Sequence, residues 1–156
     1  MRAWMLVGLC LVSPLWAADK ASEIKRRAQD AEARGQYSEV VAELGKLAPE
    51  AHSPTTALQL ANAQFREGDL TKAQAMALLA AGPKATRCEA LTLLADIYRL
   101  QEQIDEMRKA AQAAVDSDAQ CTEAWLRLGQ ALDFEGKDHA ADQAYGQYRR
   151  LTQGMK

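Results

Sequence analysis

The sequence has few of the residues that build strand-rich cores or catalytic sites. Aromatic residues make up only 6% of the 156 residues, and the chain has 2 His, 3 Cys and 4 Pro. It has no β-branched runs and no Asn-Gly or Asp-Gly hairpin turns, so β-strands have little support. Hydrophobic residues reach 48%, much of it Ala and Leu. This composition favours helices that pack closely on one another.

No motif for catalysis or for metal binding occurs. His52 and His139 each stand alone, without a second ligand at the spacing that zinc sites use. The zinc-protease, nucleophile-elbow and phosphate-loop signatures are also absent. Carboxylate pairs such as Asp105-Glu106 fit the start of a helix, where they favour the helix dipole. The sequence therefore predicts a protein that is not an enzyme and has no cofactor or metal.

The first residues follow the three-part pattern of a secretory signal peptide. Arg2 supplies a positive start, Ala3 to Trp16 carry no charge, and small residues stand at Ala17 and Ala18. The apolar stretch is shorter than the ~20 residues of a comfortable transmembrane helix. We predict a signal peptide over residues 1–17 and a mature domain over 18–156. A cut one residue later and a retained anchor are the alternatives.

The charge of the mature chain argues against two classes of partner. The full sequence has 19 Lys and Arg against 21 Asp and Glu, and cleavage removes one of the positive charges, Arg2. A net negative chain does not suit nucleic acid, whose binding depends on neutralised phosphates. No basic amphipathic helix suggests attachment to an anionic membrane either. We expect neither nucleic-acid binding nor membrane insertion after cleavage. The expected location is the periplasm of a Gram-negative bacterium, with secretion as the alternative.

The mature chain repeats itself at a fixed interval. The segment from Leu91 to Tyr98 aligns with the segment from Trp125 to Leu132 at an offset of 34 residues. The same step backwards reaches Ala57, and a further step of 33 reaches Ile24. Each unit reads as two amphipathic helices joined by a tight turn. The expected helices are 20–34 and 37–48, 54–67 and 70–81, 87–101 and 104–117, and 121–135 and 138–152.

Two columns of the alignment have a direct physical meaning. Three of the four units place a glycine in the turn between the helices, where a positive φ ends a helix at little cost; the residues are Gly35, Gly68 and Gly136, with Glu102 as the exception. The first helix of each unit carries a small residue that allows close approach of its partner, namely Ala28, Ala61, Ala95 and Gly129.

These columns resemble the tetratricopeptide repeat family, whose period is ~34 residues. The fourth unit matches best, through Trp125, Leu128, Gly129 and Tyr145, whereas the first unit has Arg27 in place of a core leucine. Such decay is typical of a solvent-facing terminal repeat. The resemblance implies an all-α solenoid of four helical hairpins in a right-handed superhelix. The expected repeats are about 21–53, 54–87, 88–121 and 122–155.

The resemblance also implies a concave groove that is lined by the first helix of each hairpin. Phe65 and Leu126 would add apolar area to this groove, and Asn62 and Gln130 could bond the backbone of a bound peptide. The residues expected to line it point away from the packing columns: Lys25, Gln29, Leu58, Asn62, Phe65, Thr92, Asp96, Arg99, Leu126, Gln130 and Asp133. The basic clamp that some members use for a C-terminal carboxylate is missing, because its positions carry residues such as Glu89 and Leu93.

We therefore predict an adaptor that binds another envelope protein, or a peptide segment of one, and assists assembly or maturation of a complex. The alternative is a structural or self-associating subunit that uses the ends of the helical stack. Tyr145, Tyr148 and Leu151 share one face of the last helix and either pack inward or form a homo-oligomer contact through the C-terminal hairpin.

Two cysteines remain in the mature chain, Cys88 and Cys121. Cys88 is expected to open the first helix of the third unit, and Cys121 to close the loop after its second helix. These two points are neighbours in a helical hairpin. An even pair in an exported protein favours a disulfide, so we predict this bridge.

Overall fold

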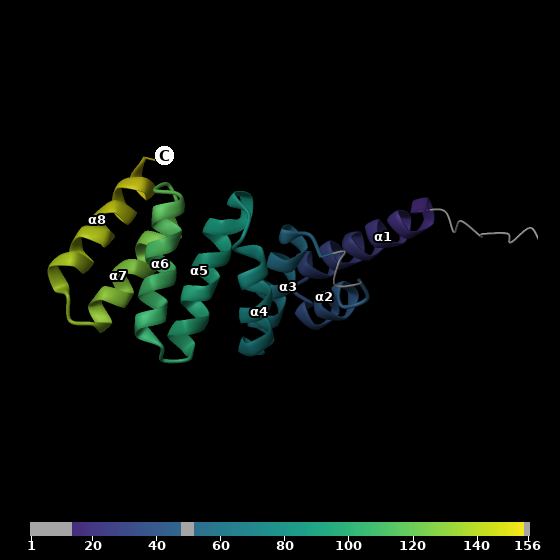
Figure 1. Ribbon diagram of the computed structural model, residues 1–156, viewed down its shortest axis with the longest axis horizontal. Coiled ribbons are helices and arrows are strands. Elements are labelled where there is room, and N and C mark those ends of the chain that lie inside the picture. The colour runs from purple at the N-terminus through teal and green to yellow at the C-terminus, as the bar shows by residue number, and fades with distance from the viewer. Residues whose placement is uncertain (1–13, 48–51, 155–156) are drawn as a thin grey trace, which may run out of the picture.

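The computed structural model describes residues 14–47 and 52–154, and the regular structure in them is entirely helical. The helices follow one another in a row (Figure 1). Within these residues they are α1 (Pro14–Ala33), α2 (Tyr37–Leu44), α3 (Pro54–Arg66), α4 (Leu70–Ala80), α5 (Lys84–Leu100), α6 (Ile104–Ser117), α7 (Thr122–Phe134) and α8 (Asp138–Gln153). The prediction of an all-α chain with four helical pairs is confirmed.

The helices pack as hairpins that stack on one another. Helices α1 and α2, α3 and α4, α5 and α6, and α7 and α8 form the pairs, and the second helix of each pair contacts the first helix of the next. Helix α5 also contacts both α3 and α7. The result is an elongated solenoid in which α3 lies beside α5, and α5 lies beside α7 (Figure 1).

The turn inside each hairpin uses a residue with positive φ. Gly35, Gly68 and Gly136 have φ of 70°, 84° and 70°. Glu102 takes the same place in the third hairpin with φ of 59°, and it is the non-glycine residue of the described chain with positive φ. The turn geometry is therefore retained where the glycine is lost, at a steric cost that the Glu102 side chain imposes.

The small-residue column lies where the paired helices come closest. Ala28, Ala61 and Ala95 are completely buried. In the last hairpin the ring of Tyr145 rests on Gly129 so closely that a Cβ there would lie 2.5 Å from the ring carbon Cε1. The column fixes the distance between helices by excluding larger side chains.

The buried side chains form two clusters. The larger one runs without interruption through the second, third and fourth hairpins and includes Leu94, Ile97 and Met107. The smaller one joins the first hairpin to α3, and Val40 and Leu44 are its largest fully buried side chains. The first hairpin is thus attached to the solenoid through a core of its own.

Some helix boundaries differ from the expected ones. Helix α1 begins at Pro14 instead of near residue 20, since proline is well tolerated at the first position of a helix. Helix α5 begins at Lys84, directly after Pro83, and α2 ends earlier than expected, at Leu44. The predicted signal peptide falls mainly on residues 1–13, outside the described residues. In the part of the chain that the structure describes, no helix is both long enough and apolar enough to cross a membrane.

Candidate partner-binding groove

A cavity of about 490 Å³ opens on the first helices of three successive hairpins. Helix α3 contributes Asn62, α5 contributes five residues, and the loop before α7 and the first two turns of α7 contribute the rest. The lining residues are Asn62, Cys88, Glu89, Thr92, Leu93, Asp96, Asp118, Gln120, Cys121, Thr122, Glu123 and Arg127. A site that spans three repeats is typical of the extended binding surfaces of solenoids.

An ion pair crosses the groove from α7 to α5. Arg127 donates from Nε to Oδ1 of Asp96 at 2.6 Å and from Nη2 to Oδ2 at 3.0 Å. The side chains of Arg127 and Asp96 are 21% and 17% exposed, and Arg99 Nε lies 3.9 Å from the same Asp96 oxygen. A two-point contact of this kind holds both side chains in one orientation and links neighbouring repeats.

A second cavity of about 240 Å³ adjoins the first at this ion pair. Its lining residues are Asp96, Arg99, Arg127, Gln130 and Phe134. Because Asp96 and Arg127 line both cavities, the two form one groove with the ion pair across its middle. We call this surface the groove from here on.

A disulfide closes one end of the groove. Cys88 and Cys121 are bonded, with their Cα atoms 6.0 Å apart, so the predicted pairing is confirmed. Cys88 lies in the second turn of α5 instead of at its start, because α5 begins at Lys84, and Cys121 immediately precedes α7. Thr92 Oγ1 donates to the Cys88 carbonyl at 2.8 Å. The bridge therefore ties α5 to the start of the next hairpin.

The structure gathers five of the predicted groove residues around these two cavities. Asn62 and Thr92 line the larger cavity, Arg99 and Gln130 the smaller one, and Asp96 lines both.

The expected position of Leu58 on the groove is wrong. Its side chain is only 6% exposed and belongs to the larger core cluster. Helix α3 packs against α5 as well as α4, and this extra contact buries a face that a two-helix picture leaves open to solvent. Phe65 is half-buried against the same cluster.

The remaining predicted groove residues lie outside both cavities. On α1, Lys25 is half-buried and Gln29 is exposed. On α7, Leu126 is half-buried, and Asp133 accepts a hydrogen bond of 2.5 Å from Tyr145 Oη. Asp133 is thus used to fasten α8 to α7.

Several groove residues were missing from the predicted set although the repeat could have revealed them. Leu93 and Arg127 stand 34 residues apart and occupy one column, and Glu89 and Glu123 occupy another. Leu93 follows Thr92, a predicted groove residue, and Glu89 lies one helical turn before it. A groove is wider than one row of side chains, so neighbouring columns of a helix contribute to it.

Tyr145 packs inward in the last hairpin, where its ring rests on Gly129. Burial, together with the hydrogen bond to Asp133, raises the pKa of Tyr145 to about 12. Tyr148 and Leu151 are both half-buried. A separate cavity of about 770 Å³ lies between α6 and α8, with Trp125, Leu128 and Leu132 of α7 among its lining.

The described residues contain no group of three His, Cys, Asp or Glu side chains that could hold a metal ion. The groove offers carboxylates, the guanidinium groups of Arg99 and Arg127, amides, and the apolar side chains of Leu93 and Phe134.

Residues 89–121 match the family model described as tetratricopeptide repeat. The matched segment begins directly after Cys88 and ends at Cys121, so it is the third repeat of the structure. The third hairpin of this chain is therefore similar to a tetratricopeptide repeat. The tetratricopeptide fold extends beyond the matched segment, because the other hairpins keep the same turn and the same small-residue column.

Solved structures with the same fold agree with this assignment. Two crystal structures of MamA align with TM-scores of 0.79 and 0.76, at 14% and 17% identity, over 86% and 88% of this chain and 80% and 75% of theirs. A putative kinesin light chain from Podosopora anserina, with nearly identical TPR-like repeats, aligns with a TM-score of 0.62 at 18% identity, over 87% of this chain and 76% of its own. No curated protein matches the sequence. Likeness at these identities establishes the tetratricopeptide-like fold of this chain.

Proposed function

We propose that this protein is an exported adaptor that holds a segment of a partner protein in the groove of α3, α5 and α7. The observation that carries the proposal is a groove that crosses three hairpins and contains polar side chains from each, such as Asn62, Thr92 and Gln130. Amide side chains can both donate to and accept from an extended backbone. The disulfide and the Asp96–Arg127 pair fix the walls, so little conformational freedom is lost on binding.

Filling the groove without changing its charge tests this function. Asn62 is exposed on α3, so Asn62→Trp should preserve the fold while its indole occupies the groove. Affinity capture from the cell envelope should recover a defined partner with the wild type and lose it with Asn62→Trp. The matched control is Gln143→Trp, which places the same side chain in the separate cavity beside α8. Equal capture by the wild type and Asn62→Trp would overturn groove binding.

A second candidate is self-association through the C-terminal hairpin. It is favoured by the cavity of about 770 Å³ between α6 and α8, where Trp125 and Leu132 provide apolar surface. This function predicts a concentration-dependent dimer in analytical ultracentrifugation that Gln143→Trp dissociates and Asn62→Trp leaves intact. The same two variants therefore separate the two candidates.

The export part of the proposal is supported by the N-terminal pattern and by the disulfide. Structural disulfides persist in oxidising compartments such as the bacterial periplasm. Cleavage after Ala17 would remove the first turn of α1, and the rest of α1 continues to Ala33. In the periplasm the adaptor would assist assembly or maturation of an envelope complex; secretion is the alternative.

Intact mass of the native protein should match a chain that begins at Ala18. A mass that includes residues 1–17, found in the membrane fraction, would contradict export of a cleaved chain.

A further inference from the structure

The two ends of the groove differ in chemistry. At the disulfide end, the lining includes the carboxylates of Glu89, Asp118 and Glu123. The cation among the lining residues there, Arg127, is committed to Asp96 through two hydrogen bonds, and its Nη1 lies 3.8 Å from Glu123. The nearest basic side chain on α5, Arg87, points to the preceding loop, where it donates to the carbonyl of Ala81 at 3.1 Å. This end of the groove is therefore net negative.

Local helix chemistry accounts for only part of this negative charge. Glu123 stands in the first turn of α7, where its negative charge interacts favourably with the helix dipole. In the loop, Asp118 Oδ1 accepts a hydrogen bond of 2.9 Å from the backbone N–H of Gln120. Glu89 lies in the second turn of α5 and is exposed to the groove. Carboxylates around a hollow reinforce one another's potential and attract a cation.

At the opposite end of the groove Phe134 presents an apolar side chain to solvent. Phe134 is 62% exposed, and Leu100, which lines neither cavity, is 49% exposed; both are among the few large hydrophobic side chains exposed in the described residues. They end α5 and α7 and stand 34 residues apart, so they hold the same place in consecutive repeats. Phe134 lines the smaller cavity beside Arg99 and Gln130. Exposed apolar side chains next to a groove suit the apolar side chain of a partner.

The length of α7 sets the spacing between these two features. A helix rises about 1.5 Å per residue, so Glu123 and Phe134, at the two ends of the groove, are roughly 16 Å apart along the axis. An extended chain covers about 3.3 Å per residue and spans this distance in roughly five residues.

We infer that the groove takes an extended protein segment that carries Lys or Arg at one end and a large apolar residue about five positions away. The basic residue lies against Glu89 and Glu123 beside the disulfide, and the apolar residue lies against Phe134. This inference rests on the proposed function, because it names the chemistry of the segment that the groove would hold.

Peptide selection on the purified protein tests the inference. Random 12-residue peptides displayed on phage are selected on the wild type, and the winners are synthesised with a fluorescent label for anisotropy titration. We expect a basic residue and an apolar residue separated by about five positions, with binding that weakens as salt is raised. The double variant Glu89→Lys with Glu123→Lys should weaken binding by about tenfold or more, because it removes two exposed ion pairs with the basic residue of the peptide. Phe134→Ser should weaken the same peptides, and replacing the basic residue of the peptide by Glu should abolish binding.

The control is Asp142→Lys, which makes the same kind of charge change on an exposed residue of α8 beside the other cavity. It should leave peptide affinity unchanged, and circular dichroism should show that all variants remain helical. Peptides that Asn62→Trp excludes, but that lack basic residues and ignore the Glu89 and Glu123 changes, would overturn this inference and leave the proposed function standing. If Asn62→Trp excludes none of the selected peptides, the proposed function fails and the inference fails with it.

Discussion

The first hairpin and the third hairpin have the same helical plan but are held by different means. The third hairpin lies inside the continuous core, to which its fully buried Leu94 and Met107 belong. A disulfide ties its first helix to the next hairpin, and the Asp96–Arg127 pair does so again. The first hairpin packs on α3 through its own smaller cluster around Leu44, and Met76 of α4 packs against the same cluster.

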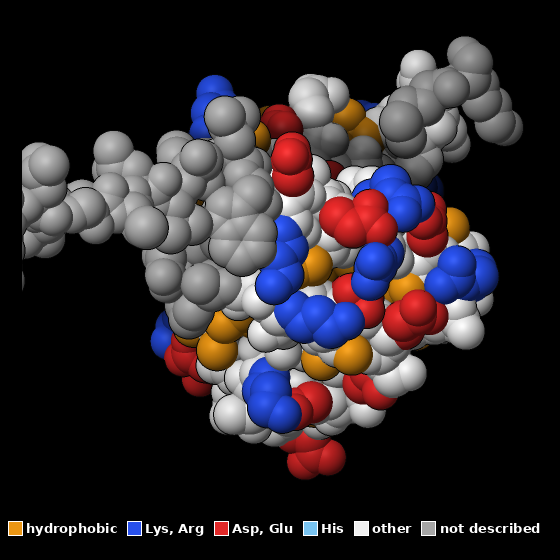
Figure 2. Space-filling model, turned by 90° about the vertical axis from the view of Figure 1, so that its right-hand side faces the viewer, with side chains coloured by type: hydrophobic (Ala, Val, Ile, Leu, Met, Phe, Trp, Pro, Cys, Tyr) orange, Lys and Arg blue, Asp and Glu red, His pale blue; other side chains and the backbone are white. Residues whose placement is uncertain are grey.

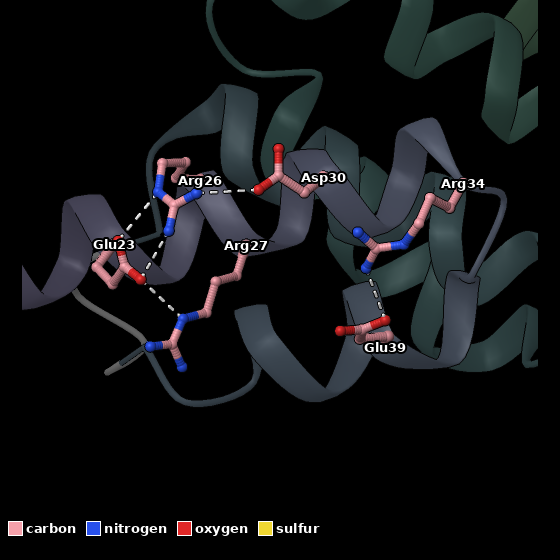
Figure 3. Close-up of polar contacts among 6 residues, drawn as sticks. All are labelled: Glu23, Arg26, Arg27, Asp30, Arg34 and Glu39. Atoms are coloured by element: carbon pink, nitrogen blue, oxygen red, sulfur yellow. Dashed lines mark hydrogen bonds and ion pairs between the residues drawn. The ribbon is translucent and has the colours of Figure 1, made fainter.

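The outer surface of α1 is charged instead of packed. Glu23 accepts from both Arg26 and Arg27, and Arg26 also reaches Asp30 at 3.1 Å (Figure 3). The end-on view from the side of α1 shows Lys and Arg interspersed with Asp and Glu, with small patches of hydrophobic side chains between them (Figure 2). Arg27, which replaces a core leucine of the repeat pattern, is 56% exposed. A terminal repeat that has no further hairpin on its outer side within residues 14–47 and 52–154 uses charge where an interior repeat uses apolar contact.

Removing one buried leucine from each hairpin should have the largest effect and give the sharpest contrast. Leu94→Ala and Leu44→Ala both empty fully buried sites and should each cost about 2–5 kcal/mol. Leu94→Ala should lower the stability of α3 to α8 together. Leu44→Ala should unfold α1 and α2 first and leave the rest folded. Hydrogen exchange along a urea series measures both, and one shared transition for the two variants would show that the hairpins unfold as a single unit.

Removing the disulfide should have the next largest effect. Cys88→Ser with Cys121→Ser opens a loop of 33 residues, and the chain-entropy model gives a loss of about 3–4 kcal/mol. The melting temperature should fall while the helical signal remains. Reduced wild-type protein is the matched control and should melt with the double variant. Unchanged melting in both would mean that the bridge adds nothing to the stability of the third hairpin.

Restoring the missing turn glycine should give a smaller, stabilising effect. Glu102→Gly relieves a side chain held at positive φ and should raise the free energy of unfolding by about 0.5–1 kcal/mol. The reciprocal variant Gly68→Ala puts a Cβ into the same conformation and should lower stability by about 1 kcal/mol. Urea unfolding of both variants measures the difference. A loss of stability in Glu102→Gly would show that the glutamate makes a compensating contact.

The charged surface of α1 should give the smallest effect, and it should depend on pH. Hydrogen bonds from Arg26 and Arg27 lower the pKa of Glu23 from 4.5 to about 2. A lowered folded-state pKa means that the contribution of Glu23 is present above pH 4.5 and is lost as pH falls toward 2. Protection factors of the α1 amides, which remove the intrinsic pH dependence of hydrogen exchange, should therefore fall over this window in the wild type. In Glu23→Gln this part of the loss of protection should be absent, whereas protection in α5 should be the same in both proteins.

Much of the fold was predictable because each repeat encodes it locally. Gly35, Gly68 and Gly136 mark the turns, and the residue that breaks this column, Glu102, still adopts positive φ. The cysteine pairing was predictable as well, since the period places Cys88 and Cys121 at neighbouring points of the stack. The start of α1 was not, because Pro14 can either end a segment or begin a helix, and only the chain around it decides which.

The groove was predictable only in part. Asn62, Thr92 and Asp96 follow from the repeat, because they face away from the partner helix of their own hairpin. Leu58 was misplaced because it is buried in the larger core cluster, which extends over neighbouring hairpins.

The sequence by itself determined the helical pairs, their turns and the faces on which each pair closes, because these depend on contacts within about 34 residues. The tertiary structure alone decided which outward-facing side chains stay open and which meet across repeats. The Asp96–Arg127 pair joins residues of different hairpins, and the separation of acidic and apolar ends exists only once α5 and α7 lie side by side. Such features depend on how hairpins stack, and the period of one hairpin does not specify them.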